Sequence, residues 1–151
     1  MLLPELVVGG TERLDDIRPM WEALNKLHAQ VAPHFRLDFE CYEFKDRKAY
    51  LQSKATLGEL RIFLIRLKGK FIGYCVASLG NDFHGEIESI YVDELYRSMK
   101  MGDTLMRAAL DWMDENGAIT KSINVVYGNE AAFSFYEKYG FYPRSTTLLQ
   151  R

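Results

Sequence analysis

The sequence is poor in cysteine, and neither sign of charge predominates. Its two cysteines, Cys41 and Cys75, lack CxxC spacing, which argues against a zinc site and against a disulfide-built scaffold. We therefore expect no metal and a reduced, cytoplasmic setting. The 19 Lys and Arg residues nearly balance the 21 Asp and Glu residues, so no basic block is available to grip a phosphate backbone. Nucleic acid is therefore not an expected partner.

Long hydrophobic runs are also missing. The longest apolar stretches, 62–67 and 71–79, have the length of strands, so we expect no contact with a membrane. The N-terminal residues lack a positively charged segment before their short apolar run, so we expect no signal peptide. There is no repeat, low-complexity tract or linker, and apolar residues make up 48% of the chain. These features favour one globular domain over residues 1–151.

Hydrophobic periodicity predicts a chain that mixes strands and helices. We expect strands at 6–8, 60–67, 71–79, 86–92, 123–126 and 141–149, and helices at 14–32, 44–55, 101–116 and 130–139. Pro19 is compatible only with a first turn, so the regular part of the first helix should begin near Asp16. Lys68-Gly69-Lys70 predicts a hairpin turn. The fold class is therefore α/β (α+β), a sandwich with a mixed sheet.

One strand–loop–helix unit has the features of an anion site. The predicted strand 86–92 ends before a polar loop, and the amphipathic helix at 101–116 follows. A helix N-terminus offers free backbone N–H groups and a favourable dipole to phosphate oxygens, and Arg97 and Lys100 add positive charge beside it. Taken alone, the unit is equally compatible with an ordinary turn whose charged side chains are solvated.

Two segments resemble the signatures of the GNAT acetyltransferase superfamily. IYVDELYRSMKMGDTLM (90–106) resembles an apolar strand that leads into (Arg/Gln)-x-x-Gly-x-(Gly/Ala) and a Leu-bearing helix. GNEAAFSFYEKYGFYP (128–143) resembles the second signature, in which Asn-x-x-Ala precedes Phe-Tyr-x-x-x-Gly-Phe. The matching residues there are Asn129, Ala132, Phe135, Tyr136, Gly140 and Phe141. The resemblance covers 60–149 well and the first helices loosely.

The resemblance implies a mixed, mainly antiparallel sheet flanked by helices on both faces. It also implies acetyl-CoA as the acyl donor, with direct transfer to a primary amine of a small molecule or peptide. By matching positions, the backbone of Ile90–Val92 would pair with pantetheine, and amides from Ser98 to Gly102 would hold the pyrophosphate. The implied cofactor-binding positions are Ile90, Tyr91, Val92, Arg97, Ser98, Met99, Lys100, Met101, Gly102, Asp103, Asn129 and Tyr136.

Catalytic roles follow from the same resemblance. The N–H of Ile90 would polarise the thioester carbonyl, and Tyr136 would protonate the departing thiolate. An alkyl amine is almost fully protonated at neutral pH, so the reaction needs a base or a proton path. Glu86 matches the strand carboxylate that acts as base in some members, while His84 and a water relay are the alternatives. Glu88 lies on the same strand face and, like His28, is expected to contact substrate.

The phosphate loop departs from the family pattern. Lys100 stands where Gly is usual, and Ser98 replaces another frequent Gly. Gly permits positive φ, whereas a Lys in left-handed geometry costs ~1 kcal/mol. Asp103 suits a first helical turn but repels a pyrophosphate. The alternative to an enzyme is therefore a degenerate domain that binds CoA or a protein partner without turnover. A homodimer formed through sheet edges or helices also stays open.

Overall fold

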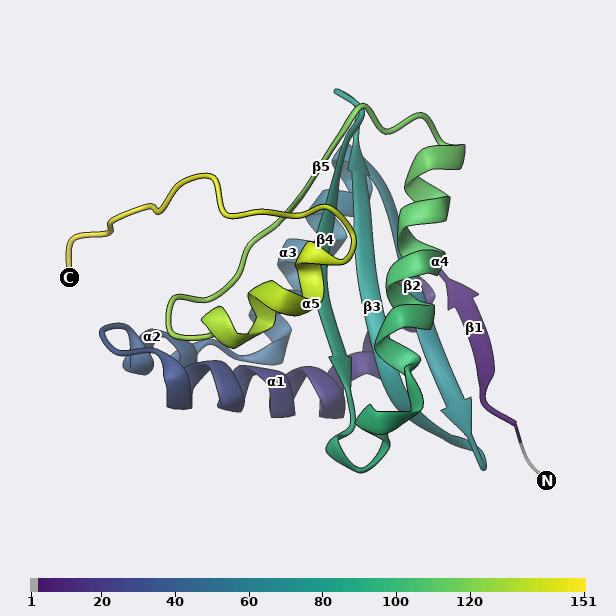
Figure 1. Cartoon of the computed structure of the whole chain (residues 1–151), viewed down its shortest axis with the longest axis horizontal. Helices are drawn as coiled ribbons and strands as arrows, with labels where there is room; N and C mark the ends of the chain where they lie inside the picture. Colours follow the sequence, from purple (N-terminus) through teal and green to yellow (C-terminus); the bar gives the residue numbers. More distant parts are fainter. Residues whose placement is uncertain (1–2) are drawn as a thin grey trace.

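A computed structural model describes residues 3–151, which form one five-stranded sheet in the order β1-β2-β3-β4-β5 (Figure 1). The strands are β1 (Glu5–Gly9), β2 (Gly58–Leu67), β3 (Lys70–Gly80), β4 (His84–Val92) and β5 (Thr120–Ile123). The helices are α1 (Arg18–Val31), α2 (Arg36–Cys41), α3 (Phe44–Leu57), α4 (Met101–Glu115) and α5 (Phe133–Glu137). Short 3₁₀ segments cover Thr11–Ile17, Glu94–Met99 and Glu130–Ala132.

The sheet is mainly antiparallel, as expected. Strands β1 to β4 pair antiparallel in sequence order, and only β4 and β5 run parallel, because α4 carries the chain back between them. The β2–β3 hairpin turns at Lys68 and Gly69, which have φ of 53° and 75°. Two consecutive positive φ values match the hairpin turn whose twist suits the flanking strands.

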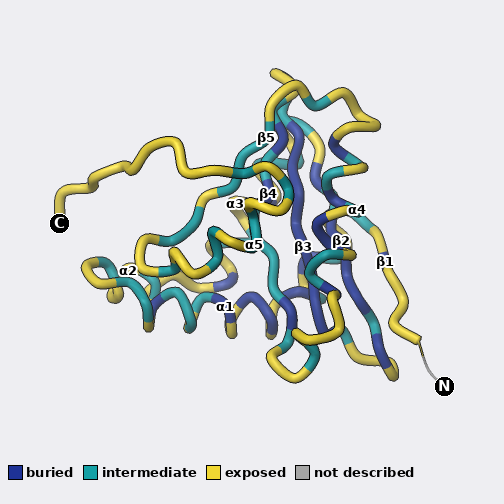
Figure 2. The backbone as a smooth tube through the Cα atoms, in the orientation of Figure 1, coloured by how far each residue is buried: buried dark blue, intermediate teal, exposed yellow. Residues whose placement is uncertain are grey.

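Helices cover both faces of the sheet. Alternate residues of β2 point to opposite faces: Phe63 and Ile65 pack in one core cluster with α4, and Ile62 and Leu64 pack in another near α1 and α3. Strands β2 and β3 form the most buried part of the molecule (Figure 2). The predicted class, a mixed sheet with helices on both faces, is therefore confirmed.

The N-terminal helices differ from the prediction in two details. Residues Thr11–Ile17 form a 3₁₀ segment, and the α-helix begins at Arg18, with Pro19 in its first turn, where a missing N–H breaks no helical hydrogen bond. The helix α2 at Arg36–Cys41 was not predicted. It buries none of its residues, so it has no apolar periodicity that the sequence could have revealed.

The predicted strand at 141–149 is wrong. After Gly140 the chain is extended but pairs with no strand among residues 3–151, and it leads away from the sheet (Figure 1). Its composition suits a strand, but no sheet edge lies alongside it, and a strand requires a partner as well as a propensity. Strand β5 also ends at Ile123 rather than at 126, because its pairing with β4 stops there.

No helix within residues 3–151 is long and apolar enough to cross a membrane.

Leu105 joins α4 to the sheet and offers a test of the core. It is 0% exposed, whereas Leu95 in the preceding 3₁₀ segment is 82% exposed. We expect Leu105→Ala to lower the free energy of unfolding by about 2–5 kcal/mol, because it removes buried methyl groups and leaves a cavity. Leu95→Ala is the matched control and should change it by less than about 0.5 kcal/mol. Urea denaturation measures both, and equal losses would contradict the assigned packing.

Candidate active site

Strands β4 and β5 stop pairing halfway along β4. They are paired from His84 with Thr120 to Ile87 with Ile123, and no pairing follows. Beyond this point the chain after β5 diverges from β4, which continues to Val92 (Figure 1). Residues 88–92 therefore have β3 on one side and no strand on the other within the described chain.

The unpaired edge of β4 presents backbone groups outward. The amide of Asp93 donates to the Ile72 carbonyl on β3 at 2.7 Å, whereas the carbonyl of Val92 accepts from Arg97 Nε at 3.0 Å, away from β3. Since successive residues of a strand face opposite neighbours, the amides of Ile90 and Val92 face the open side. An extended amide-containing chain such as pantetheine could pair with them.

A bulge in β4 lies at the point of divergence. Val76 faces Ser89 across the β3–β4 ladder and Ala77 faces Ile87, so Glu88 is the extra residue. Bulges bend a strand and redirect its side chains. Here the bend separates the paired half of β4 from the open half that contains Ile90.

Tyr136 lies over this open half. Its ring packs against the core cluster that contains Cys75, and Cys75 faces Ile90 in the β3–β4 register. Burial, and then the nearby Cys75 thiol, raise the pKa of Tyr136 to about 12. The phenol therefore keeps its proton throughout the neutral range and can act as a donor near Ile90.

The loop before α4 supplies the other candidate cofactor contacts. Ser98, Met99 and Lys100 are exposed, and Lys100 adopts the left-handed conformation with φ 58° and ψ 28°. The sequence pattern located this special backbone position correctly, although Lys rather than Gly occupies it. A Cβ at Gly102 would lie 3.3 Å from the Phe135 ring, so small size at Gly102 lets α5 approach the start of α4.

Arg97 is less free than the sequence suggested. Besides its bond to the Val92 carbonyl, its guanidinium lies 5.5 Å from the centre of the Tyr91 ring. Its charge stays at the end of β4, but one of its donors is already used by the protein.

Asp103 is engaged by two neighbours. It accepts a hydrogen bond from the hydroxyl of Tyr139 and two from Arg107 Nε, at 2.9 and 3.1 Å. The bond from Tyr139 and then that from Arg107 lower the pKa of Asp103. Arg107 therefore offsets the charge that would repel a pyrophosphate, and the carboxylate links α4 to the segment after α5.

Asn129 lies at the turn before α5. Its amide donates to the Val126 carbonyl at 2.9 Å, and its carbonyl accepts from Ala132 at 3.0 Å. The preceding Gly128 has φ of 106°, and a Cβ there would lie 2.1 Å from the Val31 carbonyl oxygen. This close approach fixes the turn against the end of α1, and the side chain of Asn129 makes no cap hydrogen bond.

The two strand carboxylates share one cation. Lys54 Nζ on α3 lies 3.4 Å from Glu86 and 3.3 Å from Glu88, which confirms that both carboxylates lie on one face. The side chain of Glu88 is 1% exposed, and its carboxylate also accepts a hydrogen bond from Ser78 Oγ at 2.6 Å. Burial opposes the charge on Lys54, but Glu88 and then Glu86 hold its pKa above the usual value.

Sequence reasoning missed the basic side of this cluster. Arg47 donates to the Glu88 carbonyl at 2.7 Å, and both Arg47 and Lys54 contact the ring of Tyr50. The seven-residue spacing of Arg47 and Lys54 puts them on one side of α3, which was the available signal. The buried Nε of Arg47 and hydroxyl of Ser89 have no hydrogen-bond partner among the described residues.

The histidines occupy different positions. The ring nitrogens of His84 lie 2.7 Å from Thr120 Oγ1 and 2.8 Å from Ser122 Oγ, so His84 bridges the paired ends of β4 and β5. It is six residues, or about 20 Å of strand, from Ile90. His28 on α1 is partly buried, and burial followed by the Arg47 charge lowers its pKa. Its ring packs edge-on against Phe39, with 6.1 Å between the ring centres.

The model of one protein family matches most of this chain. Residues 21–141 match the model for the acetyltransferase (GNAT) family. The chain belongs to the acetyltransferase (GNAT) family. The open half of β4, the start of α4 and Tyr136 all lie within the region of this GNAT protein that matches the family model.

One curated relative matches about half of the chain. The GNAT protein is 31% identical over 80 residues to a Bacillus subtilis (strain 168) protein provisionally named as an alanine N-acetyltransferase of ribosomal protein bS18. The alignment spans 53% of this chain and 52% of the relative, so the chain matches about half the length of that protein.

Solved structures agree in fold. A GCN5-related N-acetyltransferase from Ralstonia eutropha JMP134 superposes with a TM-score of 0.79 at 16% identity, covering 99% of both chains. The PaiA N-acetyltransferase from Thermoplasma acidophilum, solved in complex with coenzyme A, gives a TM-score of 0.73 at 20% identity. There the alignment covers 96% of this chain and 93% of the other. Among residues 3–151 no group of three His, Cys, Asp or Glu side chains could hold a metal.

Removing the shared cation should destabilise the protein in a pH-dependent way. Lys54→Met leaves the buried Glu88 carboxylate without its ion pair, and we expect the free energy of unfolding to fall by ~1–3 kcal/mol at pH 8. That loss is below the range for fully buried pairs because the Lys54 side chain is 30% exposed. Because the pKa of Lys54 is raised in the folded protein, the loss should be fully present below the usual lysine value of 10.5 and should shrink as the pH rises through the raised pKa, where wild-type Lys54 also loses its charge. Lys45→Met, at an exposed pair with Glu43, is the control.

The effects of the backbone conformation and of the side chain of Lys100 can be tested separately. Lys100→Gly relieves ~1 kcal/mol of left-handed strain but adds similar unfolded-state entropy, so the free energy of unfolding should barely change. If the ammonium contacts phosphate, CoA affinity in calorimetry should fall about fivefold, or about 1 kcal/mol. Lys68→Gly is the control, because Lys68 has φ of 53° in the β2–β3 hairpin, outside the proposed pyrophosphate loop. Unchanged CoA affinity in Lys100→Gly would exclude the side-chain contact.

Proposed function

We propose that this GNAT protein transfers the acetyl group of acetyl-CoA to a primary amine of a small molecule or peptide. The observation that carries the proposal is the position of Tyr136. It packs beside Cys75, which faces Ile90, and Ile90 lies on the half of β4 whose outer edge is open. This arrangement supports the proposal of a proton donor close to the outward-facing amides of β4.

The residues fit acetyl-CoA, which supplies the acetyl group as a thioester. The outward amides of β4 would hold the pantetheine, and the N–H of Ile90 would stabilise charge on the thioester oxygen. The start of α4 and the exposed loop 98–100 would bind the pyrophosphate through backbone donors. Asp103 does not oppose this, because Tyr139 and Arg107 already occupy its oxygens.

Tyr136 is proposed as the general acid. When the C–S bond breaks, the phenol donates its proton to the departing sulfur, and the proton balance is restored from the acceptor amine. A pKa of about 12, raised by burial, ensures that the proton is present at neutral pH.

Glu86 is the proposed base, acting through water or directly. It is more exposed than Glu88, whose carboxylate is buried and committed to Ser78 and Lys54. Glu86 lies four residues before Ile90, at most about 13 Å along the strand, so a water relay is the natural path. His84 is a poorer candidate, because both of its ring nitrogens already contact hydroxyls at the closed end of the strands.

The acceptor is proposed to bind on the side of the α1–α2 connection. A groove of about 720 Å³ is bordered there by Pro33, His34, Phe35, Val126 and Tyr127, and also by residues 146–149 of the C-terminal segment. The name of the Bacillus relative makes a peptide N-terminus that begins with alanine the first acceptor to test. Small molecules that carry a primary amine form the second class of acceptor to test.

Binding and turnover separate the enzyme from a degenerate domain. Acetyl-CoA in excess should raise the melting temperature of an active enzyme, and thiol release should then depend on an added acceptor. The screen would include peptides with N-terminal alanine, amino acids, polyamines and aminoglycosides. Stabilisation by acetyl-CoA without transfer to any acceptor would favour a CoA-binding domain that lacks catalysis.

Tyr136→Phe tests the acid directly. With an acceptor from the screen, we expect kcat to fall about 10²–10⁴-fold, while CoA affinity changes little because the ring remains. Tyr142→Phe, which alters an exposed tyrosine outside the site, should leave kcat unchanged. Full activity of Tyr136→Phe would show that another group protonates the thiolate.

A further inference from the structure

Arg47 is the one cation of α3 that has no carboxylate partner within residues 3–151. The helix carries four cationic side chains. The other three each pair with an acid: Lys45 with Glu43, Lys48 with Asp15, and Lys54 with Glu86 and Glu88. Arg47 donates instead to a neutral group, the backbone carbonyl of Glu88, at 2.7 Å. A guanidinium keeps its charge at neutral pH, so a partly buried one without a carboxylate attracts an anion from outside the chain.

Other polar atoms near Arg47 also lack a partner. Arg47 Nε, Ser89 Oγ and the hydroxyl of Tyr74 are buried and form no hydrogen bond with any described residue. Tyr74 faces Tyr91 and Val76 faces Ser89 across the β3–β4 ladder, so Tyr74 and Ser89 are diagonal neighbours on one face of the sheet. Burial raises the pKa of the Tyr74 hydroxyl and the charge of Arg47 partly offsets that rise, because the two groups lie near one another. Buried polar groups nearly always have partners, so these three atoms mark a polar site that the chain alone does not complete.

Arg47 lies next to the edge of β4 where the proposed transfer takes place. Glu88, whose carbonyl it binds, is two residues from Ile90, or about 7 Å along the strand. Helix α3 packs on one face of the sheet, whereas α4, with the proposed pyrophosphate loop before it, packs on the other (Figure 1). Phosphates held at the start of α4 are therefore separated from Arg47 by the sheet. An anion bound at Arg47 would belong to the acceptor and not to the cofactor.

The groove proposed for the acceptor leads towards Arg47. Phe39 borders the groove, and its ring packs against that of His28, with 6.1 Å between the ring centres. Burial and then the charge of Arg47 lower the pKa of His28, so His28 lies close to Arg47 and is neutral at neutral pH. It therefore connects the groove to Arg47 without adding a second charge.

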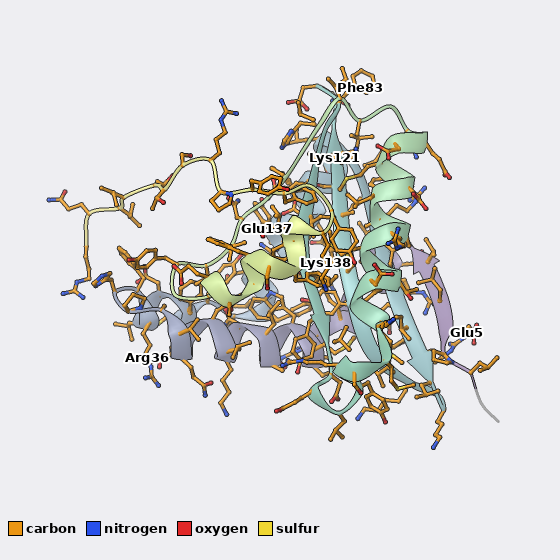
Figure 3. All side chains as sticks on the ribbon, viewed as in Figure 1. Glu5, Arg36, Phe83, Lys121, Glu137 and Lys138 are labelled. Carbon is orange, nitrogen blue, oxygen red and sulfur yellow. The ribbon has the colours of Figure 1, made fainter. Side chains whose placement is uncertain are left out.

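Two other arginines near the groove do not serve its inner end. Arg36 extends from α2 into solvent (Figure 3) and pairs with Glu40 at 2.7 Å. Arg151 borders the groove and donates to the His34 carbonyl at 3.3 Å. It is the C-terminal residue, and the C-terminus lies at the far left of Figure 1, well away from β4. Arg47 is therefore the cation that an acceptor group near β4 would meet.

We propose that the acceptor carries a carboxylate about 7 Å from its primary amine, and that Arg47 binds this carboxylate while the amine reaches β4 at Ile90. Carboxylate recognition at Arg47 rests on the proposed acetyl transfer and narrows its acceptor class. Arg47 Nη1, which forms no hydrogen bond with residues 3–151, is the donor that the carboxylate takes. A dipeptide with a free C-terminus, or an ω-amino acid of similar length, has the required separation, because two extended residues span about 7 Å. Polyamines and aminoglycosides offer Arg47 no anion and are disfavoured.

Matched acids and amides test the carboxylate by binding alone. The purified chain is saturated with CoA, which carries no acetyl group, and is titrated by calorimetry with L-alanyl-L-alanine, glycylglycine and 5-aminopentanoate, each compared with its C-terminal amide. At least one acid should bind about 10–100-fold more tightly than its amide, the effect expected of a hydrogen bond to a charged group. Equal binding of acid and amide, or no binding, in all three pairs would overturn the proposal.

Arg47→Gln assigns the preference to one side chain. Glutamine keeps an amide donor for the Glu88 carbonyl but removes the charge, so the ratio of acid to amide affinity should fall to about one, while the affinity for the amide barely changes. Lys48→Gln is the matched control, because it removes a cation at the next position of α3, one that pairs with Asp15, and it should keep the wild-type ratio. Circular dichroism checks that the variants are folded. Arg47→Lys keeps the charge without the planar donor fork and should give an intermediate ratio, which tests the assignment even if the glutamine variant does not fold. An unchanged ratio in a folded Arg47 variant would overturn the assignment.

Transfer assays with acetyl-CoA separate carboxylate recognition from the proposed function. A lower KM for the acid than for its amide, with similar kcat, would support both. Preferential binding of the acid without acetyl transfer would contradict the enzyme and leave the role of Arg47 intact. Transfer to amines irrespective of a carboxylate would support the enzyme and overturn the role of Arg47.

Discussion

The candidate site depends on the point at which β4 and β5 stop pairing, after Ile87 and Ile123. A strand that is paired on both sides has no backbone groups left for a ligand. Here pairing stops next to the bulge at Glu88, and the remaining half of β4 keeps its outward amides unpaired. The same divergence sends the chain after β5 towards the end of α1, where Gly128 contacts Val31. The open half of β4 and the turn at Gly128 therefore have one structural origin.

The two GNAT signatures act as one packed unit. Phe135 of the second signature lies against Gly102 of the first, and Tyr139 donates to Asp103 near the start of α4. These contacts fix α5 relative to the loop before α4 and bring Tyr136 over β4. Contacts between the two segments therefore account for several of the motif positions without a ligand.

On the opposite face of the sheet, which α3 covers, a compact ionic cluster lies at the bulge. Glu88 is the extra residue, and its buried carboxylate requires a cation, which α3 supplies as Lys54. Because Lys54 also contacts Glu86, the electrostatics of the proposed base depend on a helix outside both signatures. A cation held between two carboxylates occupies a place where a substrate ammonium would also be stabilised. If Glu86 acts as the proposed base, Lys54 would compete with the acceptor ammonium for its carboxylate.

Local patterns in the sequence determined the elements that can be recognised one at a time. The hairpin at Lys68-Gly69, the helix from Met101, the left-handed position at Lys100 and the motif tyrosine Tyr136 all depend on residues close in sequence. Other features depend on which distant segments meet. They are the bulge in β4, the short β5, the contacts of Lys54 with Glu86 and Glu88, and the unpaired residues 142–151. The sequence at 141–149 has strand propensity, but a strand exists only where a second edge lies within hydrogen-bonding distance. The residues determined the capacity for pairing, and only the tertiary arrangement decided where that pairing ends.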